Sequence, residues 1–469
     1  MDKKTLHILI GPAAFLVLTL LLNGIFSFKA AVGIGLTIWM GLWWILRPVD
    51  IAVTSFLPIV INSIFDLVPA GHVISQYFSE IVVLLVGSDI ISLTWTSSGL
   101  DRRLAVNALC FIGPSMRQQI TVWLIASTIL SAILPNVVVV MIFVPIALSM
   151  LKFLGEQDIA KSKIAVPILL AIGWGAGIGG FGSPLGGAAN LTAISYLEKL
   201  LGHEFMYIDW IIRFVPFLCF VMLLNLFFLL ALPVPVRQLA DTKDYFQKIR
   251  ADLGAMNRSE IIGLLLFGIA TLLAFLRPVF AEAFPSMRPA YIFFIGGMLT
   301  FVLKGETGKV MLTWKDAEKG LMWGMFYLFA GGLALGRIVT ETGATARLAS
   351  LVAQLPLSGG IETIAVFTIF STLLTEISSN TAAASIAIPV IQSISQEIGL
   401  APIPYILITI VAVNCAYILP VSTRAIPVSC GLNPSLMFRY GLKLSVLNII
   451  MTTLLGWLAI KFWPLFNTL

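Results

Sequence analysis

Charged side chains are scarce in this chain. Asp, Glu, Lys and Arg make up 11% of its 469 residues, whereas a soluble domain carries about 25%. Apolar residues reach 59%, and the mean hydropathy is +1.00. So few polar side chains cannot cover a water-facing surface of this size. The composition therefore excludes a soluble enzyme, a nucleic-acid-binding protein and a disordered chain, and it indicates a protein that crosses a membrane many times.

Residues that bind metals or form disulfides are also few. The cysteines stand apart in apolar sequence without metal or redox spacing, at Cys110, Cys219, Cys415 and Cys430. The histidines lie at the ends of apolar runs, at His7, His72 and His203. We therefore expect no metal centre and no bound cofactor. A membrane-embedded enzyme is disfavoured for the same reason, because it would need a nucleophile–base pair or metal ligands near the midplane.

The apolar residues form long uniform runs rather than the alternating pattern of a β-barrel. They predict an all-α polytopic membrane protein with about 11 transmembrane helices and two re-entrant helical hairpins. The predicted spans are Leu6–Phe28, Ala31–Leu46, Ile51–Val68, Ile81–Thr96, Ile164–Ile178, Ile208–Leu232, Ile261–Leu276, Tyr291–Leu303, Leu321–Val339, Tyr405–Ile418 and Leu436–Trp463. The predicted hairpins are the broken pairs Ile120–Leu134 with Val137–Leu154 and Ile361–Ile377 with Ala382–Ile398.

The basic residues orient these spans. With the N-terminus in the cytoplasm and each broken pair returning to its own side, most of the 29 lysines and arginines fall at cytoplasmic ends. The C-terminus then lies outside. The one long polar stretch, residues 233–258, becomes a cytoplasmic linker that could form an amphipathic surface helix. We expect an integral protein of a bacterial cell membrane.

A repeat relates the two halves of the chain at one constant offset. The matched pairs include Gly87 with Gly331, Arg103 with Arg347, Asn136 with Asn380, and Pro145 with Pro389. Chance explains matches between aliphatic residues, but it does not explain Gly, Arg, Asn and Pro in a single frame. In the orientation above, one copy enters from the cytoplasm and the other from outside. The repeat is therefore inverted, as is typical of secondary transporters.

Each copy of the repeat contains a polar break inside its hairpin. The breaks are Pro135-Asn136 and Ser378-Ser379-Asn380-Thr381. Such residues favour caps and turns, because their side chains bond nearby backbone. Helices that meet at these tips would present free N–H groups to an anion and unwound carbonyl groups to a cation. The alternative is a plain helix kink that neighbouring helices satisfy.

A second break follows each hairpin. The first, residues 173–190, is rich in glycine and contains Ser183-Pro184, and the second contains Ser422-Thr423-Arg424. Glycine lets the backbone approach a ligand, and proline stops a helix. These breaks therefore add candidate binding residues. For the glycines of 173–179, close helix packing is the alternative.

These features together resemble the divalent anion/sodium symporter (DASS) family over nearly the whole chain. The most specific motif is Ser379-Asn380-Thr381, with Pro389 following in the next helix. The resemblance implies a lipid-embedded homodimer that works as an elevator and carries di- and tricarboxylates. It also implies that the tip residues Asn380 and Thr381, with Asn136 in the first tip, bind substrate carboxylates. Sodium would be held at Ser379 and Asn380.

The resemblance further implies a scaffold and a moving transport domain. The predicted scaffold comprises residues 1–80 and 259–304. Residues 81–232 and 305–469 would be the two transport repeats. We expect the scaffold to make the dimer contact.

The sequence departs from the family pattern at three places. The first tip reads Pro135-Asn136-Val137 where the family has Ser-Asn-Thr. The second breaks of the family tend to read Ser/Thr-Pro-Pro-Asn, whereas here they read Ser183-Pro184-Leu185-Gly186 and Thr423-Arg424-Ala425-Ile426, so that Arg424 stands where the family has proline. An intramembrane arginine is a functional candidate, because guanidinium can bind a carboxylate through two hydrogen bonds. The alternative for Arg424 is an ion pair with Glu376. We predict that Arg424 supplies the positive charge that sodium supplies in the family, and that the chain exchanges C4–C6 di- and tricarboxylates such as 2-oxoglutarate, malate or succinate without sodium.

Two other modes of transport stay open. One is sodium-coupled dicarboxylate symport, as in the family that the sequence resembles. The other is sodium/proton antiport, which would need paired buried acids near the breaks. Asp89 and Glu376 are the available acids.

Overall fold

The computed structural model describes residues 2–234, 238–239, 242–347 and 357–468. Within these ranges the protein is built from helices and contains no β-strand, as the sequence predicts. Nine of the described helices are long and apolar enough to cross a membrane. One of them, Asn136–Phe153, is an arm of a predicted hairpin, and three shorter apolar helices join the remaining eight. The described helices thus agree with the eleven spans and two hairpins that the sequence predicts.

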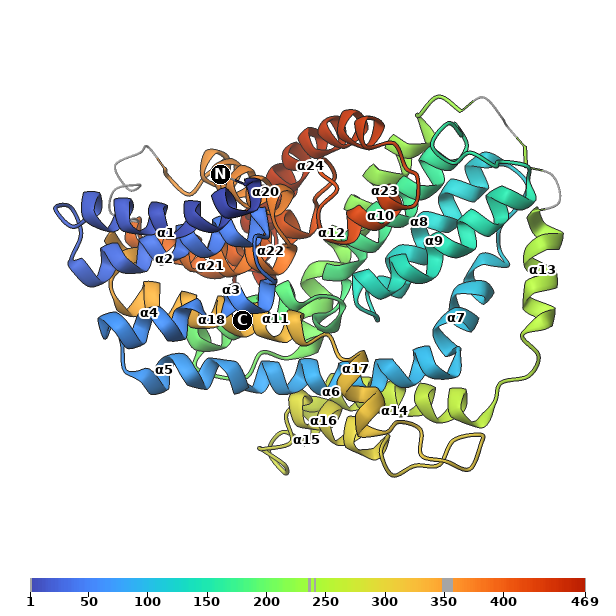
Figure 1. The fold of residues 1–469 in the computed structure, drawn as a ribbon, viewed down its shortest axis with the longest axis horizontal. Coiled ribbons are helices and arrows are strands. Elements are labelled where there is room, and N and C mark those ends of the chain that lie inside the picture. The colour runs from blue at the N-terminus through green and yellow to red at the C-terminus, as the bar shows by residue number, and fades with distance from the viewer. Residues whose placement is uncertain (1, 235–237, 240–241, 348–356, 469) are drawn as a thin grey trace.

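The first helices form a layer at one end of the molecule. Helices α1 (Lys3–Leu22) and α2 (Phe28–Leu46) pack along each other (Figure 1). The single span predicted at Ile51–Val68 is two helices, α3 (Ile51–Ser55) and α4 (Leu57–Phe65). Pro58 explains the break, because proline has no N–H and its ring would clash with the preceding turn. A short helix, α5 (Ala70–Ile74), leads into α6.

Helix α6 belongs to a bundle along the lower edge of Figure 1. The bundle contains α6 (Glu80–Ser98), α14 (Arg258–Phe275), α15 (Arg277–Phe280), α16 (Pro289–Leu299) and α17 (Trp314–Gly320). Gly87 permits the close approach of α6 to α16, because a Cβ atom there would lie 2.5 Å from the backbone nitrogen of Phe294. The predicted linker contains the peripheral helix α13 (Thr242–Asp252), and residues 235–237 and 240–241 of that linker lie outside the described residues.

The two repeats supply the remaining helices. The first begins with α6, which contains Gly87, and continues with α7 (Leu100–Leu109), α8 (Met116–Ser131), α9 (Asn136–Phe153), α10 (Ala165–Gly179), α11 (Ala188–Leu201) and α12 (Tyr207–Leu230). The second contains α18 (Trp323–Glu341), α20 (Ile361–Ile377), α21 (Asn380–Glu397), α22 (Pro402–Asn414), α23 (Ala425–Ser429) and α24 (Pro434–Phe462), and α25 (Pro464–Asn467) follows it. Helices α9 and α21 each begin at the tip asparagine and have the same length. The hairpins therefore end at equivalent residues.

The glycines of α10 pack against the first arm of the hairpin. A Cβ atom on Gly175 would lie 2.8 Å from the Leu124 carbonyl oxygen, and one on Gly179 would lie 2.3 Å from that of Thr128. Helix α10 continues unbroken to Gly179. For these glycines the structure supports close helix packing, and the true break lies between Gly179 and Ala188.

Candidate functional site

A cavity of about 470 Å³ lies where the two hairpin tips, the second breaks and α6 meet. Its polar lining includes Ser88, Asp89, Ser92, Asn136, Ser379, Asn380, Thr381, Asn414, Ser422 and Thr423. The structure thus brings together most of the predicted site residues, from both repeats, around one space. Arg47 and Asp89 are the charged residues among the described lining.

The first tip holds its asparagine through a buried hydroxyl. Ser131 Oγ lies 2.7 Å from Asn136 Oδ1 and also 2.7 Å from the carbonyl oxygen of Ala176. Asn136 Nδ2 lies 3.5 Å from the carbonyl oxygen of Gly177. Since an amide NH₂ carries two N–H groups, the half-buried Asn136 keeps a donor for a ligand.

The second tip repeats this arrangement with other residue types. Thr375 Oγ1 lies 3.0 Å from Asn380 Oδ1 and 2.6 Å from the carbonyl oxygen of Val413. Asn380 Nδ2 donates to Asn414 Oδ1 at 3.3 Å. Thr375 and Ser131 are related by the same offset as the two tip asparagines. Both amides are therefore oriented before any ligand arrives, which reduces the entropy cost of binding.

Two helix N-termini also face the cavity. Asn136 and Val137 begin α9, Asn380 and Thr381 begin α21, and all four line the cavity. The Ser379 hydroxyl caps α21 by accepting from the Ala382 N–H at 3.2 Å. Helix N-termini carry partial positive charge and unpaired N–H groups. Two such ends at one cavity suit an anion.

Ser183 and Pro184 do not line the cavity, although their neighbours do. Leu185, Gly186 and Gly187 contribute to the lining. Ser183 donates to the carbonyl oxygen of Ala132, and its Oγ accepts from the Leu185 N–H at 3.2 Å. Ser183 thus fixes the loop of the first break to the first hairpin.

Two buried asparagines that we did not select from the sequence connect the repeats. Asn190 Nδ2 donates to the carbonyl oxygens of Gly180 at 2.7 Å and Ser183 at 2.8 Å. Asn414 Nδ2 donates to Asn190 Oδ1 at 3.4 Å and to the Ile410 carbonyl oxygen at 2.9 Å. Both lie beside a helix break. A single asparagine within apolar sequence next to such a break is the feature that would have identified them from the sequence.

Strained backbone is concentrated at this cavity. Among the described residues, the non-glycine residues with positive φ are Arg47, Asp66 and Ser422, and two of these three line the cavity. A left-handed conformation costs a residue of this kind about 1–3 kcal/mol and is retained where the surroundings enforce it, often at ligand sites. Ser422 has φ of 58° and Arg47 has φ of 48°.

Arg424 lies behind the cavity wall. Its Nη1 is 3.0 Å from Glu376 Oε2, and its Nη2 donates to the Thr375 carbonyl oxygen at 3.1 Å. The Arg424 side chain is 3% exposed and does not line the cavity. In this structure Arg424 makes the ion pair that the sequence left as the alternative to substrate binding.

The two intramembrane acids differ in their surroundings. Besides Arg424, Glu376 accepts the backbone N–H groups of Tyr417 at 2.7 Å and Ile418 at 2.9 Å, so its oxygens are well satisfied. Asp89 lines the cavity and accepts the Met322 N–H at 3.1 Å. The structure does not bring these two acids together as cavity residues, because only Asp89 lines the cavity.

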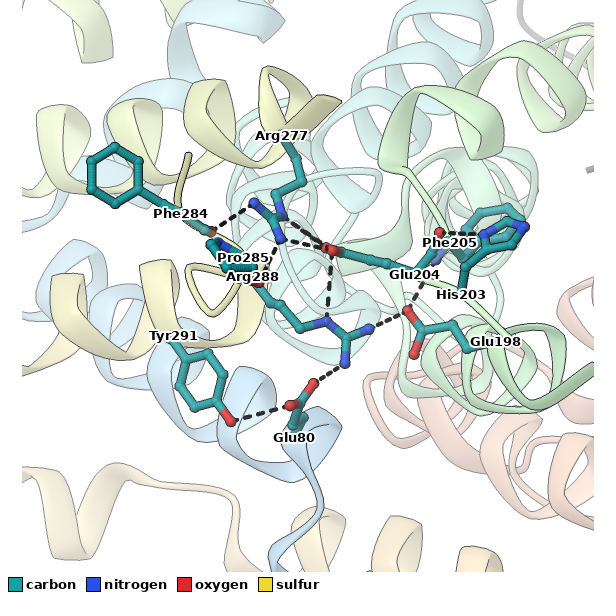
Figure 2. A network of polar contacts seen from close by, with 10 residues as sticks. All are labelled: Glu80, Glu198, His203, Glu204, Phe205, Arg277, Phe284, Pro285, Arg288 and Tyr291. Carbon is teal, nitrogen blue, oxygen red and sulfur yellow. Dashed lines mark hydrogen bonds and ion pairs between the residues drawn. The ribbon is translucent and has the colours of Figure 1, made fainter. Parts of the chain in front are cut away.

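A separate network of ion pairs joins the end of α11 and the loop after it to the bundle that contains α6, α14, α15 and α16 (Figure 2). Arg277 Nε lies 3.1 Å from both carboxylate oxygens of Glu204. Arg288 pairs with Glu80, with Glu198 at 2.6 Å and with Glu204 at 3.8 Å. Burial alone would lower the pKa of Arg288, but Glu198, Glu80 and Glu204 raise it above its ordinary value. The network thus fixes the first repeat to this bundle in the conformation seen here.

Comparison with known proteins identifies the family of this chain. The family model described as "Citrate transporter" matches residues 41–412. The chain belongs to this citrate transporter family. It is 30% identical, over 95% of its length, to the sodium-dependent dicarboxylate transporter SdcS of Staphylococcus saprophyticus, and it covers 89% of that protein. SdcS of Staphylococcus aureus is 28% identical over 90% of the chain and is 84% covered.

A transporter of known structure has the same fold as this chain. The YdaH transporter of Alcanivorax borkumensis aligns with a TM-score of 0.54 and 14% identity, over 87% of this chain and 90% of that one. These comparisons confirm the resemblance to the DASS family. The protein is an integral membrane transporter and not an enzyme.

Proposed function

We propose that this protein transports C4–C6 carboxylates, foremost dicarboxylates such as succinate, malate and 2-oxoglutarate, together with sodium. The observation that carries the proposal is the cavity between the two tips. Asn136 and Asn380 each keep an N–H donor there, and each begins a helix whose N-terminus faces the same space. A small molecule with a carboxylate at each end matches two equivalent anion sites.

Charge balance supports a cation that travels with the substrate. The hairpins and second breaks contribute only neutral side chains to the described cavity lining. The charge of Arg424 is balanced by Glu376 behind the wall. Removing a carboxylate from water costs several kcal/mol unless a countercharge accompanies it. A dianion carried by these elements therefore needs mobile cations.

Sodium is the cation that we propose. Ser379 and Asn380 would supply side-chain oxygens, and hard cations prefer oxygen ligands. Two relatives that cover most of the chain are sodium-dependent dicarboxylate transporters by name. Sodium-independent exchange stays a prediction and is the second candidate. It is favoured by the first tip, where Pro135 and Val137 replace a Ser oxygen and a Thr hydroxyl of the family motif.

We propose that transport follows an elevator movement in a homodimer, with the N-terminus in the cytoplasm and the C-terminus outside. The hairpins and second breaks would move, and α1, α2, α14 and α16 would belong to the fixed scaffold. Helix α6 falls within residues 81–232, which we predicted from the sequence to be a transport repeat, but it packs on α14 and α16, and we propose that it belongs to the scaffold instead. The substrate site would then lie between fixed and moving parts.

Ligand-induced stabilisation of the purified protein tests this proposal. A ligand that binds only the folded state raises its stability, by about 2.7 kcal/mol at 100 times Kd. We expect succinate, malate or 2-oxoglutarate to raise the melting temperature in sodium chloride but not in potassium or choline chloride. Acetate at equal concentration is the matched control. Stabilisation by no dicarboxylate in any salt would refute the proposal, and equal stabilisation in every salt would favour sodium-independent exchange.

A further inference from the structure

The cavity contains one cation among its described lining residues, and that cation is Arg47. It ends helix α2 as the C-cap in a left-handed conformation, with φ of 48° and ψ of 49°. The residue is exposed, and its guanidinium makes no hydrogen bond or ion pair within the described part of the chain. Arg47 is therefore an uncompensated positive charge at the edge of an otherwise mostly neutral cavity.

Within the described residues, Arg47 makes no ion pair with the acids around it. Asp89, the other charged residue of the described cavity lining, accepts the Met322 N–H at 3.1 Å and makes no ion pair with Arg47. Arg47 and Ile51 line both the cavity and a neighbouring pocket of about 730 Å³. That pocket also includes Lys4 and Asp50. The carboxylate of Asp50 caps α3 by accepting the Ala52 N–H at 2.8 Å, and it makes no ion pair with Arg47. Arg47 thus lines both spaces, and its side-chain N–H groups make no hydrogen bond within the described residues.

We propose that Arg47 binds one carboxylate of the substrate at the mouth of the cavity and sets the affinity on one side of the membrane only. This inference rests on the proposed function. A guanidinium can bind a carboxylate through two parallel hydrogen bonds, and it remains charged at every physiological pH. The helix N-termini and tip amides then receive the other end of the dianion. The left-handed backbone at Arg47 ends α2, and the Arg47 N–H donates to the Trp43 carbonyl oxygen, so the residue has a fixed place at the helix end.

The sidedness follows from where Arg47 is attached. Helix α2 packs mainly on α1, and both helices belong to the part of the molecule that we assign to the scaffold, whereas the tips belong to the moving part. When the tips move to the other side of the membrane, Arg47 stays behind. The contact therefore exists only while the cavity faces the side on which α2 ends. In the orientation that the basic residues predict, that side is the cytoplasm.

Vesicles of defined orientation test the inference. Right-side-out and inside-out membrane vesicles that contain Arg47→Ala, Arg47→Lys or wild-type protein are assayed for the KM of labelled succinate. We expect Arg47→Ala to raise the KM at the cytoplasmic face by roughly 10-fold or more, the effect of losing hydrogen bonds to a charged group. The KM at the outer face should change less than about two-fold. Arg47→Lys should recover part of the affinity, because it retains the charge but not the fork of donors.

Lys4→Ala is the matched control, since Lys4 lines the neighbouring pocket but not the cavity. It should leave both KM values unchanged. An unchanged cytoplasmic KM in Arg47→Ala would overturn the inference, as would equal increases at both faces. An equal effect of Lys4→Ala would also overturn it, because it would indicate a general surface potential or a lipid headgroup contact. In each of these results wild-type transport of succinate persists, so the proposed function would stand. Failure of the wild type to transport any dicarboxylate would instead refute the proposed function.

High salt separates contact from long-range attraction. At 1 M ionic strength the Debye length falls to about 3 Å, so charge steering is screened. The KM difference between wild type and Arg47→Ala should persist under these conditions. Its disappearance would show that Arg47 attracts the dianion without binding it and would overturn the contact.

Discussion

Arg424 Nη1 lies 3.0 Å from Glu376 Oε2, and both side chains are almost fully buried. This pair connects the end of α20 to the second break, because Arg424 also bonds the Thr375 and Val421 carbonyl oxygens. Its two charges cancel within the part of the protein that we expect to move. The pair therefore stabilises the wall of the cavity, and the substrate charge must be balanced by something else.

Removal of one partner of this pair should destabilise the protein strongly. Arg424→Met leaves Glu376 as an uncompensated buried charge, at a cost of about 3–5 kcal/mol. The double variant Arg424→Met/Glu376→Gln should recover much of that loss, because no net charge remains buried. Thermal unfolding in detergent measures the stability of the wild type, the single variant and the double variant. If Arg424→Met were as stable as the wild type but unable to bind succinate, Arg424 would be a substrate ligand, as we predicted from the sequence.

Both tip asparagines should be needed for transport. Asn136→Ala and Asn380→Ala each remove a donor to a charged carboxylate, worth about 1.5–3 kcal/mol, and should reduce succinate binding at least 10-fold. Asn225→Ala is the control, because Asn225 is buried in α12 and does not line the cavity. Binding is measured by isothermal titration of protein that elutes as a single folded species. Wild-type affinity in both tip variants would contradict a shared site.

The hydroxyl behind each tip should act by positioning the amide. Thr375→Val conserves the side-chain volume but removes the bonds to Asn380 and to the Val413 carbonyl oxygen. We expect the KM for succinate to rise several-fold with a smaller change in kcat, since the amide loses its fixed orientation. Thr375→Ser restores the hydroxyl and should restore the KM. A change in stability without any change in KM would leave Thr375 with a structural role only.

The ion pairs of Figure 2 should hold the conformation seen here. Arg288→Ala leaves Glu80, Glu198 and Glu204 close together with fewer countercharges, so the first repeat should separate from the bundle more often. In a variant without native cysteines, a cysteine at the buried position Ile194 reports this opening by its rate of thiol labelling. We expect labelling to accelerate several-fold. Arg102→Ala, outside the network, should leave the rate unchanged, and an unchanged rate in Arg288→Ala would contradict the role of the network.

The repeat made the architecture predictable from the sequence. Matches such as Asn136 with Asn380 locate both tips, and the structure begins α9 and α21 at these residues. The boundaries that were missed have local causes. Pro58 divides a span that hydropathy alone treats as continuous. The glycine-rich sequence of α10 looks like a break, but Gly175 and Gly179 serve close packing against α8.

Individual side-chain directions were less predictable. The position of Arg424 in the chain made it a candidate for binding a substrate carboxylate, whereas the structure turns its guanidinium toward Glu376. Sequence offset cannot decide between these outcomes, because both place Arg424 beside the second tip. Arg47 shows the reverse case. It looked like an ordinary basic residue at a helix end, and only the three-dimensional arrangement of α2 brings it to the cavity.

Uptake into proteoliposomes tests the central claim most directly. Purified protein is reconstituted into vesicles without internal carboxylate, and labelled succinate is added outside under an inward sodium gradient. We predict accumulation above the external concentration, its loss when potassium replaces sodium, and its loss in Asn380→Ala. Absence of succinate uptake in every salt, with or without internal dicarboxylate, would contradict dicarboxylate transport. Uptake that needs internal dicarboxylate but not sodium would contradict the proposed sodium coupling.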